Sequence, residues 1–169
     1  MPRPEARIFI DGGARGNPGP AGYGMQVTGP EGDVLGSYFG YLGVQTNNVA
    51  EYHALLAALE HARHRGWKRL WIGSDSELLV RQFQGEYRVK NAGLRALFER
   101  CRELVSSFEE LTVEHLPRER NAEADALANR AMNLKESNLA PGSSALPPRA
   151  GSGAEKGTAS RMGEGASGG

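Results

Sequence analysis

Near residue 48 the spacing of apolar residues changes from that of β-strands to that of α-helices. Before this point, runs of β-branched and aromatic residues lie at 7–11, 23–28 and 34–42, with glycine and proline between them. The segment from Gly12 to Gly22 holds five glycines and two prolines, and we expect it to form a loop. Three strands joined this closely in the chain predict an antiparallel meander.

After residue 48 the pattern alternates between helices and strands. Strands are expected at 69–73 and 111–116, and apolar residues at helical spacing predict helices over 48–65, 78–83, 93–108 and 121–134. The resulting order is β-β-β-α-β-α-α-β-α. Strand–helix–strand units require parallel pairing with helical crossovers, whereas the first three strands pair antiparallel. The sequence therefore predicts an α/β fold with a mixed five-stranded sheet, three antiparallel strands and then parallel ones, flanked by helices.

The composition changes at residue 137. Of the 33 residues in 137–169, 23 are Gly, Ala, Ser or Pro, which leaves too little apolar surface to offset the entropy of ordering the chain. We therefore expect a folded domain over residues 1–136 and a disordered tail over residues 137–169.

Charge and cysteine content exclude several classes of protein. Twenty basic and twenty acidic residues give a formal net charge of zero, so any contact with nucleic acid must be local. A single cysteine, Cys101, excludes an internal disulfide framework and a cysteine-based zinc site. No apolar run approaches the roughly 20 residues of a membrane span, and the start of the chain lacks the apolar stretch of a signal peptide. We expect a cytoplasmic monomer with no membrane partner.

Four acidic residues lie at the ends of predicted elements. Asp11 closes the first strand and Asp75 follows the fourth, so both lie where ligands of α/β sheets gather. Glu51 and Asp125 lie in the first turns of two helices. Carboxylates that converge without basic partners repel one another, and Mg²⁺ or Mn²⁺ relieves that repulsion. Taken singly, the four acids also fit roles as a turn residue, helix-start charges and a helix cap, and position alone leaves both interpretations open.

Motifs around these acids extend the pattern. They are IDGGARGNPGPAGYG at 10–24, TNNVAEYHAL at 46–55, SDS at 74–76 and RERNAEADALA at 118–128. In this order the motifs resemble those of type 1 ribonucleases H, over about residues 7–134. The resemblance implies the ribonuclease H-like fold and an endonuclease that hydrolyses the RNA strand of RNA–DNA hybrid duplexes. The products are implied to carry 5′-phosphate and 3′-hydroxyl ends.

The resemblance also assigns roles to single residues. The residues implied to be catalytic and to hold two Mg²⁺ or Mn²⁺ ions are Asp11, Glu51, Asp75 and Asp125. The implied substrate contacts are Gly12, Gly13, Asn17, Asn47, Asn48 and Asn121. Thr46 is implied to reach a phosphate of the DNA strand. Asn48 and Asn121 also fit the role of helix N-caps, which would leave their side-chain amides free for substrate.

The chain departs from the family pattern in two places. Many type 1 enzymes carry a histidine in a glycine-rich loop before the last carboxylate, whereas here only three residues separate Pro117 from Asn121. We expect Arg118 to replace this histidine as a catalytic residue that holds the leaving phosphate, and we interpret His115 as structural. The usual basic protrusion between the middle helices is also short, and any grip on the DNA strand depends there on Arg88, Lys90 and Arg95.

Two other interpretations stay open. One is a non-catalytic hybrid-binding module on the same fold, and the presence of all four acids argues against it. The other is a different nuclease of the same superfamily, such as a resolvase or integrase core. That interpretation would leave the Asn47–Asn48 pair and the Gly12–Gly13 pair unexplained.

Overall fold

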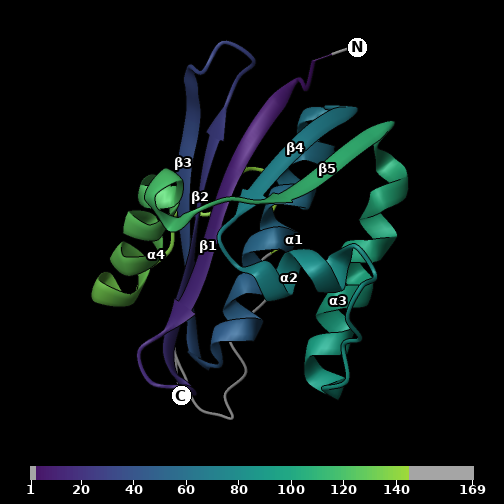
Figure 1. Cartoon of the computed structure of the whole chain (residues 1–169). Coiled ribbons are helices and arrows are strands. Elements are labelled where there is room, and N and C mark those ends of the chain that lie inside the picture. The colour runs from purple at the N-terminus through teal and green to yellow at the C-terminus, as the bar shows by residue number, and fades with distance from the viewer. Residues whose placement is uncertain (1–2, 145–169) are drawn as a thin grey trace.

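The computed structural model describes residues 3–144, in which a mixed five-stranded sheet carries helices on both faces (Figure 1). The strands lie in the order β3-β2-β1-β4-β5. The antiparallel strands are β1 (Ala6–Ala14), β2 (Gly19–Thr28) and β3 (Val34–Gln45). The strands that continue the sheet in parallel from β1 are β4 (Arg69–Ser74) and β5 (Glu110–His115). The sheet that the sequence predicted is therefore confirmed.

Four α-helices pack on this sheet. They are α1 (Asn47–Arg65), α2 (Glu77–Phe83), α3 (Ala92–Leu104) and α4 (Ala122–Leu134). Thr46 is the N-cap of α1, and its side-chain oxygen accepts a hydrogen bond from Val49 N at 3.2 Å. The helix ends at Gly66, which takes a left-handed φ of 76°. The suggestion that Asn48 caps this helix was therefore wrong, because Thr46 occupies that position.

β1 and β2 run through the glycine-rich segment that the sequence predicted as a loop, and only residues 15–18 connect them. The ladder between the two strands continues to the pair Ala14–Ala21. A side chain at Gly12 would overlap the backbone of α1, and one at Gly24 would overlap the backbone of α4. The loop prediction was wrong for residues 12–14 and 19–22, because a glycine such as Gly12 also allows a helix to pack closely against a strand. Gly24, in the part of β2 that was predicted as a strand, does the same for α4.

The same glycines show that α1 and α4 cover opposite faces of the sheet. Gly24 is paired with Asp11, and paired residues point to the same side while neighbours along a strand alternate. Asp11 therefore belongs to the face that α4 covers, and Gly12 belongs to the face that α1 covers together with the buried Ile8 and Ile10. Figure 1 shows α4 apart from the other three helices. α1 is buried along most of its length, since it lies between the sheet and α3.

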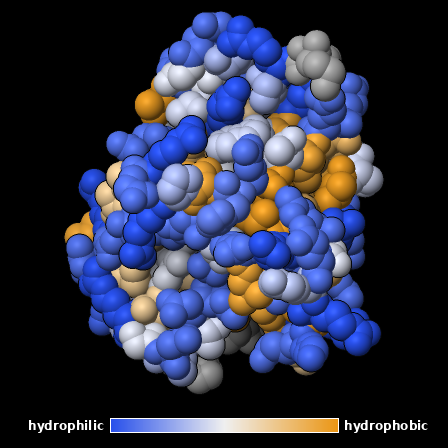
Figure 2. All heavy atoms as spheres, in the orientation of Figure 1, coloured by the Kyte–Doolittle hydropathy of each residue, from blue (hydrophilic) through white to orange (hydrophobic). Residues whose placement is uncertain are grey.

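The exterior is largely polar on the face shown in Figure 2, where hydrophobic side chains form small groups between hydrophilic ones. No helix in the described part of the chain is both long and apolar enough to cross a membrane.

Residues 137–144 pack on the domain, so the folded part extends eight residues beyond the boundary expected at 136. Asn138 forms an isolated β-bridge with Phe39 of β3, and its side-chain oxygen accepts a hydrogen bond from Phe39 N at 2.7 Å. Ser144 donates to the two carboxylate oxygens of Glu60 in α1, from its backbone N at 3.0 Å and from its hydroxyl at 2.8 Å. This segment therefore crosses the β3 edge of the sheet from α4 to α1. The rest of the expected tail lies outside the described residues.

A chain that ends at residue 136 should unfold at a lower temperature than one that ends at 144. The shorter chain leaves the Glu60 carboxylate, which is 5% exposed, without Ser144. It also removes the Pro141 carbonyl, which accepts a hydrogen bond from His61 Nδ1 at 2.8 Å. Arg100 still pairs with Glu60 at 3.0 Å, but the buried His61 Nδ1 loses its partner. Because a buried polar group without a partner costs about 1–3 kcal/mol, we expect scanning calorimetry to show a drop of roughly 5–10 °C. The chain ending at 144 is the control, and equal melting temperatures would show that residues 137–144 contribute nothing.

Candidate active site

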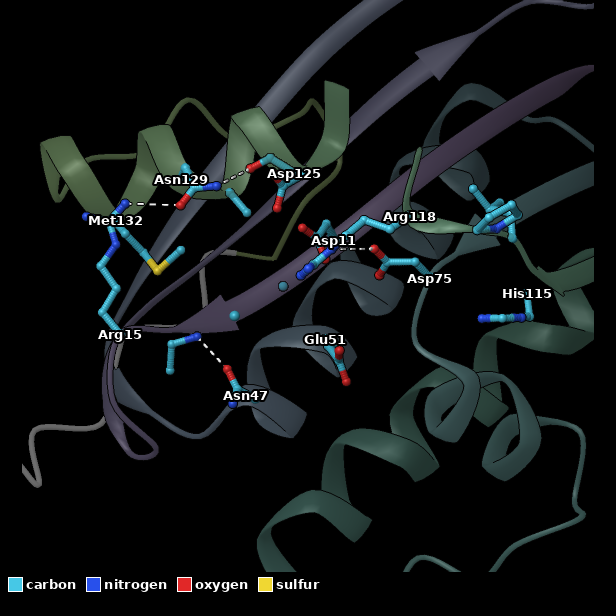
Figure 3. A pocket seen from close by; sticks show the side chains of 16 residues that line it. Asp11, Arg15, Asn47, Glu51, Asp75, His115, Arg118, Asp125, Asn129 and Met132 are labelled. Atoms are coloured by element: carbon cyan, nitrogen blue, oxygen red, sulfur yellow. Dashed lines mark hydrogen bonds and ion pairs between the residues drawn. The ribbon is translucent and has the colours of Figure 1, made fainter. Parts of the chain in front are cut away.

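Four carboxylates from four elements line one open cleft with a volume of about 670 Å³ (Figure 3). Asp11 comes from β1, Glu51 from α1 and Asp125 from α4, and Asp75 directly follows β4. The sequence placed these acids at element ends, and the structure brings all four to the same cleft.

Asp11 lies where β1 loses its neighbour β4. The parallel pairing of these strands ends at Ile10 and Ser74, so Asp11 and Asp75 are the next residues along the two chain segments. Beyond this point β4 no longer covers the edge of β1, and side chains from both faces of the sheet, Glu51 and Asp125, line the same cleft. α1 lies directly against β1 at this point, because glycine follows Asp11, and it brings Glu51 to the cleft. The site is therefore a consequence of where one parallel strand stops.

Asn121 fixes the start of α4 against β1. Its side chain donates from Nδ2 to the carbonyl oxygen of Ile10 at 2.8 Å, and the residue is 1% exposed. It makes no side-chain capping bond with α4. Asn121 therefore occupies the expected N-cap position of α4 without the side-chain bond of a cap, and its burial does not fit the substrate contact that the resemblance implied. Asn121 instead ties α4, and with it Asp125, to the residue that precedes Asp11.

Burial and like charge make two acids of this cleft, Asp11 and Glu51, hard to ionise. Burial, followed by the negative charge of Asp75 and by contact with Asp125, raises the pKa of Asp11 to about 8. Burial raises the pKa of Glu51 to about 7, although a hydrogen bond donated by Ser76 Oγ at 3.0 Å opposes the shift. The same Ser76 oxygen accepts from a backbone N–H as the N-cap of α2, so it is held in place.

The donor set suits a hard divalent cation, because it consists of carboxylate oxygens that repel one another. The negative charges of Asp75 and Asp125 both raise the pKa of Asp11, and such a group of carboxylates is unfavourable unless a proton or a cation neutralises it. Among residues 3–144, however, no three Asp, Glu, His or Cys side chains are close enough together to enclose one ion. The four acids therefore form the walls of a cleft, and their fit to a metal rests on their chemistry and charge.

We expect the metal-free protein to become less stable as the pH rises from about 4 to about 8. Asp11 and Glu51 have higher pKa values folded than unfolded, so in this window the folded state binds more protons. As these protons leave with rising pH, the free energy of unfolding falls. The Asp11→Asn variant lacks the Asp11 part of this dependence, so its melting temperature should exceed that of wild type by an amount that grows with pH. Thermal unfolding in EDTA between pH 5 and pH 8 measures this, and a difference that is constant with pH would contradict the raised pKa.

Asn17 and Asn47 hold the β1–β2 turn against the start of α1. Asn47 Oδ1 accepts from Ala14 N at 2.7 Å, and Asn17 Oδ1 accepts from Asn47 N at 3.0 Å. Asn47 lines the cleft, and its amide nitrogen is not used by these bonds. Gly13 also lines the cleft, and a side chain there would meet no atom closer than Asn47 Oδ1 at 3.8 Å. Asn48 is exposed and lies outside the cleft lining.

The segment after β5 brings two further residues to the cleft. Arg118 Nε lies 3.9 Å from Asp75 Oδ2, and its side chain is 85% exposed. His115, interpreted from sequence as structural inside its strand, is the last residue of β5, is exposed and lines the cleft. That interpretation does not fit the structure, because β5 ends one residue earlier than expected.

Several residues that line the same cleft were not predicted from the sequence, and those with long side chains include Arg15, Asn129 and Met132. A signal for Asn129 was present, since it follows Asp125 by four residues and so lies on the same helix face. Arg15 had no comparable signal, because a loop arginine is ordinarily solvated.

Comparison with known proteins identifies the family. A family model described as "Reverse transcriptase-like" matches residues 9–131. Ribonuclease HI of Halobacterium salinarum is 39% identical over 125 residues, which are 74% of this chain and 63% of that protein. The crystal structure of RNase H1 from this archaeon superposes with a TM-score of 0.73 at 38% identity, over 76% of this chain and 97% of the solved one. The chain belongs to the ribonuclease H family.

Two other solved structures support the same assignment. The N-terminal RNase H domain of Rv2228c from Mycobacterium tuberculosis has a TM-score of 0.74 and 42% identity, over 78% of this chain and 95% of that one. LC11-RNase H1, solved in complex with an RNA/DNA hybrid, has a TM-score of 0.72 and 43% identity, over 77% of this chain and 98% of that one. The chain spans 35% of the length of the whole Rv2228c protein, which is named as bifunctional.

Proposed function

We propose that this protein is an endonuclease that hydrolyses the RNA strand of RNA–DNA hybrids. The observation that carries the proposal is the cleft, where four carboxylates from four elements meet and two of them have pKa values raised toward neutrality. Membership of the ribonuclease H family supports it. The hybrid complex of LC11-RNase H1, which is 43% identical, supports the choice of substrate.

The residues that would hold two divalent cations, Mg²⁺ or Mn²⁺, are Asp11, Glu51, Asp75 and Asp125. When bound, the ions would supply activation of the attacking water and stabilisation of charge on the leaving 3′ oxygen. Cleavage of the bond between phosphorus and this 3′ oxygen would leave a 5′-phosphate on one product and a 3′-hydroxyl on the other.

The remaining groups of the cleft would orient the hybrid. Only the RNA strand has 2′-hydroxyls, which both donate and accept hydrogen bonds, and the backbone at Gly13 and the amide of Asn47 are open to meet them. The Thr46 hydroxyl uses its oxygen to cap α1 and keeps its proton for a phosphate oxygen. The lack of a side chain at Gly12 lets α1 pack against β1 and so positions Glu51, and the Gly12 backbone also lines the cleft that would take the substrate.

Cleavage of a hybrid with a labelled RNA strand tests the proposed metal dependence and end chemistry together. We expect products with Mg²⁺ or Mn²⁺ and none with EDTA, and we expect a DNA polymerase to extend their 3′ ends without prior treatment. Products that a phosphatase must treat before extension would contradict the proposed ends. Binding of the hybrid without cleavage would instead identify a hybrid-binding module.

A further inference from the structure

Arg15 and Asn129 join the β1–β2 turn to α4 across one end of the cleft. Arg15 Nη2 donates to Asn129 Oδ1 at 3.1 Å, over a sequence separation of 114 residues. Asn129 Nδ2 in turn donates to the carbonyl oxygen of Asp125 at 3.0 Å, one helical turn earlier. The guanidinium is therefore held by the same helix turn that carries one of the four carboxylates.

The backbone under Arg15 is also fixed. Arg15 N donates to the carbonyl oxygen of Pro20 at 2.8 Å and so closes the last pair of the β1–β2 hairpin. Asn47 holds the preceding residue, Ala14, from the side of α1. A turn secured by helices on both faces of the sheet gives the Arg15 side chain a defined starting point.

The charge environment leaves Arg15 available to an anion. Within residues 3–144, the side chain of Arg15 has a neutral amide oxygen as its polar partner and no carboxylate within 4.0 Å, whereas Arg118 faces Asp75. A guanidinium has five N–H donors, so one bond to Asn129 leaves most of them free. Figure 3 shows Arg15 at one end of the cleft, apart from the four carboxylates, whereas the Arg118 side chain reaches in beside Asp11 and Asp75. Arg15 is therefore a cation at the edge of the cleft that no carboxylate of the site neutralises.

We propose that Arg15 binds a phosphate of the RNA strand next to the scissile phosphate, and that Asn129 positions its guanidinium. The inference rests on the proposed function, since Asp11, four residues earlier in the chain, is the group that would meet the scissile phosphate. A planar guanidinium binds phosphate oxygens bidentately, which fixes the register of the strand as well as adding affinity. Phosphate contacts of this kind position a duplex without reading its sequence.

Hybrid affinity as a function of salt tests the proposal in an Asp11→Asn background, in which turnover is blocked. We expect Arg15→Ala to weaken binding about tenfold and to reduce the slope of log Kd against log salt by about 0.9, as loss of one phosphate contact requires. Arg15→Lys should keep most of the slope and recover only part of the affinity. The matched control is Arg3→Ala, which removes an equally charged, exposed arginine that pairs with Glu31 outside the cleft. Equal effects of Arg15→Ala and Arg3→Ala would overturn the proposal.

Replacing single phosphates by uncharged methylphosphonates locates the contact. A methylphosphonate at one RNA position beside the cleavage site should weaken binding of the hybrid by the protein that has Arg15. The same methylphosphonate should not change binding by the Arg15→Ala variant. Asn129→Ala should reduce the effect at that same position while circular dichroism shows an intact fold, which separates positioning from stability.

The outcomes of the scan also separate this inference from the proposed function. An Arg15-dependent position on the DNA strand, or none at all, would overturn the inference while cleavage of the hybrid by wild type still upheld the proposed function. A protein that neither binds nor cleaves the hybrid would overturn both.

Discussion

Replacing Asp11 by asparagine is expected to abolish cleavage of an RNA–DNA hybrid while the protein stays folded. Asp11 lies between Asp75 and Asp125 in the cleft, and its pKa is raised by burial and by their charge. The variant loses one of the four ligands proposed for the divalent cations, which would stabilise the transition state by several kcal/mol. We therefore expect a rate loss of at least about a thousandfold, measured as single-turnover cleavage with Mg²⁺.

The control for this variant is Glu123→Gln. Glu123 is an exposed carboxylate of α4, two residues from Asp125, and it does not line the cleft. The Glu123→Gln variant should cleave the hybrid at a rate within about twofold of wild type, because surface substitutions away from a site have small effects. Removing one of several repelling charges should leave the melting temperature of Asp11→Asn unchanged or raised. Cleavage by Asp11→Asn near the wild-type rate would contradict the assignment of the site.

Arg118→Ala is expected to lower turnover by about one to two orders of magnitude. The Arg118 guanidinium is 3.9 Å from Asp75 and largely exposed, so its neighbour holds it weakly and it is free to turn toward a phosphate. A charge-assisted hydrogen bond to phosphate contributes roughly 1.5–3 kcal/mol, which corresponds to this range of rates. Arg118→Lys should recover only part of the rate, because the forked geometry is lost. Steady-state cleavage of one hybrid measures both variants.

His115→Ala is the comparison that decides whether Arg118 replaces the family histidine. His115 lines the cleft, but within the described residues its ring makes no hydrogen bond or ion pair with the four carboxylates. We therefore expect this variant to keep a rate within about threefold of wild type. A loss in His115→Ala larger than that in Arg118→Ala would show that the histidine performs the role assigned to Arg118.

Local sequence patterns were sufficient for the element order, whereas the four acids were assigned to one site by the resemblance to ribonucleases H, because their positions alone left their roles open. Period and turn chemistry located each strand and helix to within a few residues. Asp75 directly follows its strand as expected, but Asp11 lies inside β1, which continues for three residues to Ala14. The glycine-rich segment misled this reasoning, because glycine permits both a turn and a close approach. Only the packing of α1 and α4 on opposite faces shows that Gly12 and Gly24 serve the second purpose.

The missed features depend on contacts between distant parts of the chain. Residues 137–144 are poor in large apolar side chains, yet hydrogen bonds hold them to β3 and to the buried Glu60. Such bonds cannot be inferred from amino-acid composition. Asn121 reads locally as a cap, but its partner is the Ile10 carbonyl, 111 residues away. Arg15 meets Asn129 for the same reason, and no local pattern indicates such a pair.

The most direct test of the central claim is cleavage of one RNA–DNA hybrid labelled on either strand, with a DNA duplex of the same sequence beside it. With Mg²⁺ we expect the labelled RNA strand to be cut at internal positions, the labelled DNA strand and the DNA duplex to stay intact, and EDTA to stop all cleavage. A hybrid that is bound but not cut, or a DNA strand that is cut as fast as the RNA strand, would contradict the account.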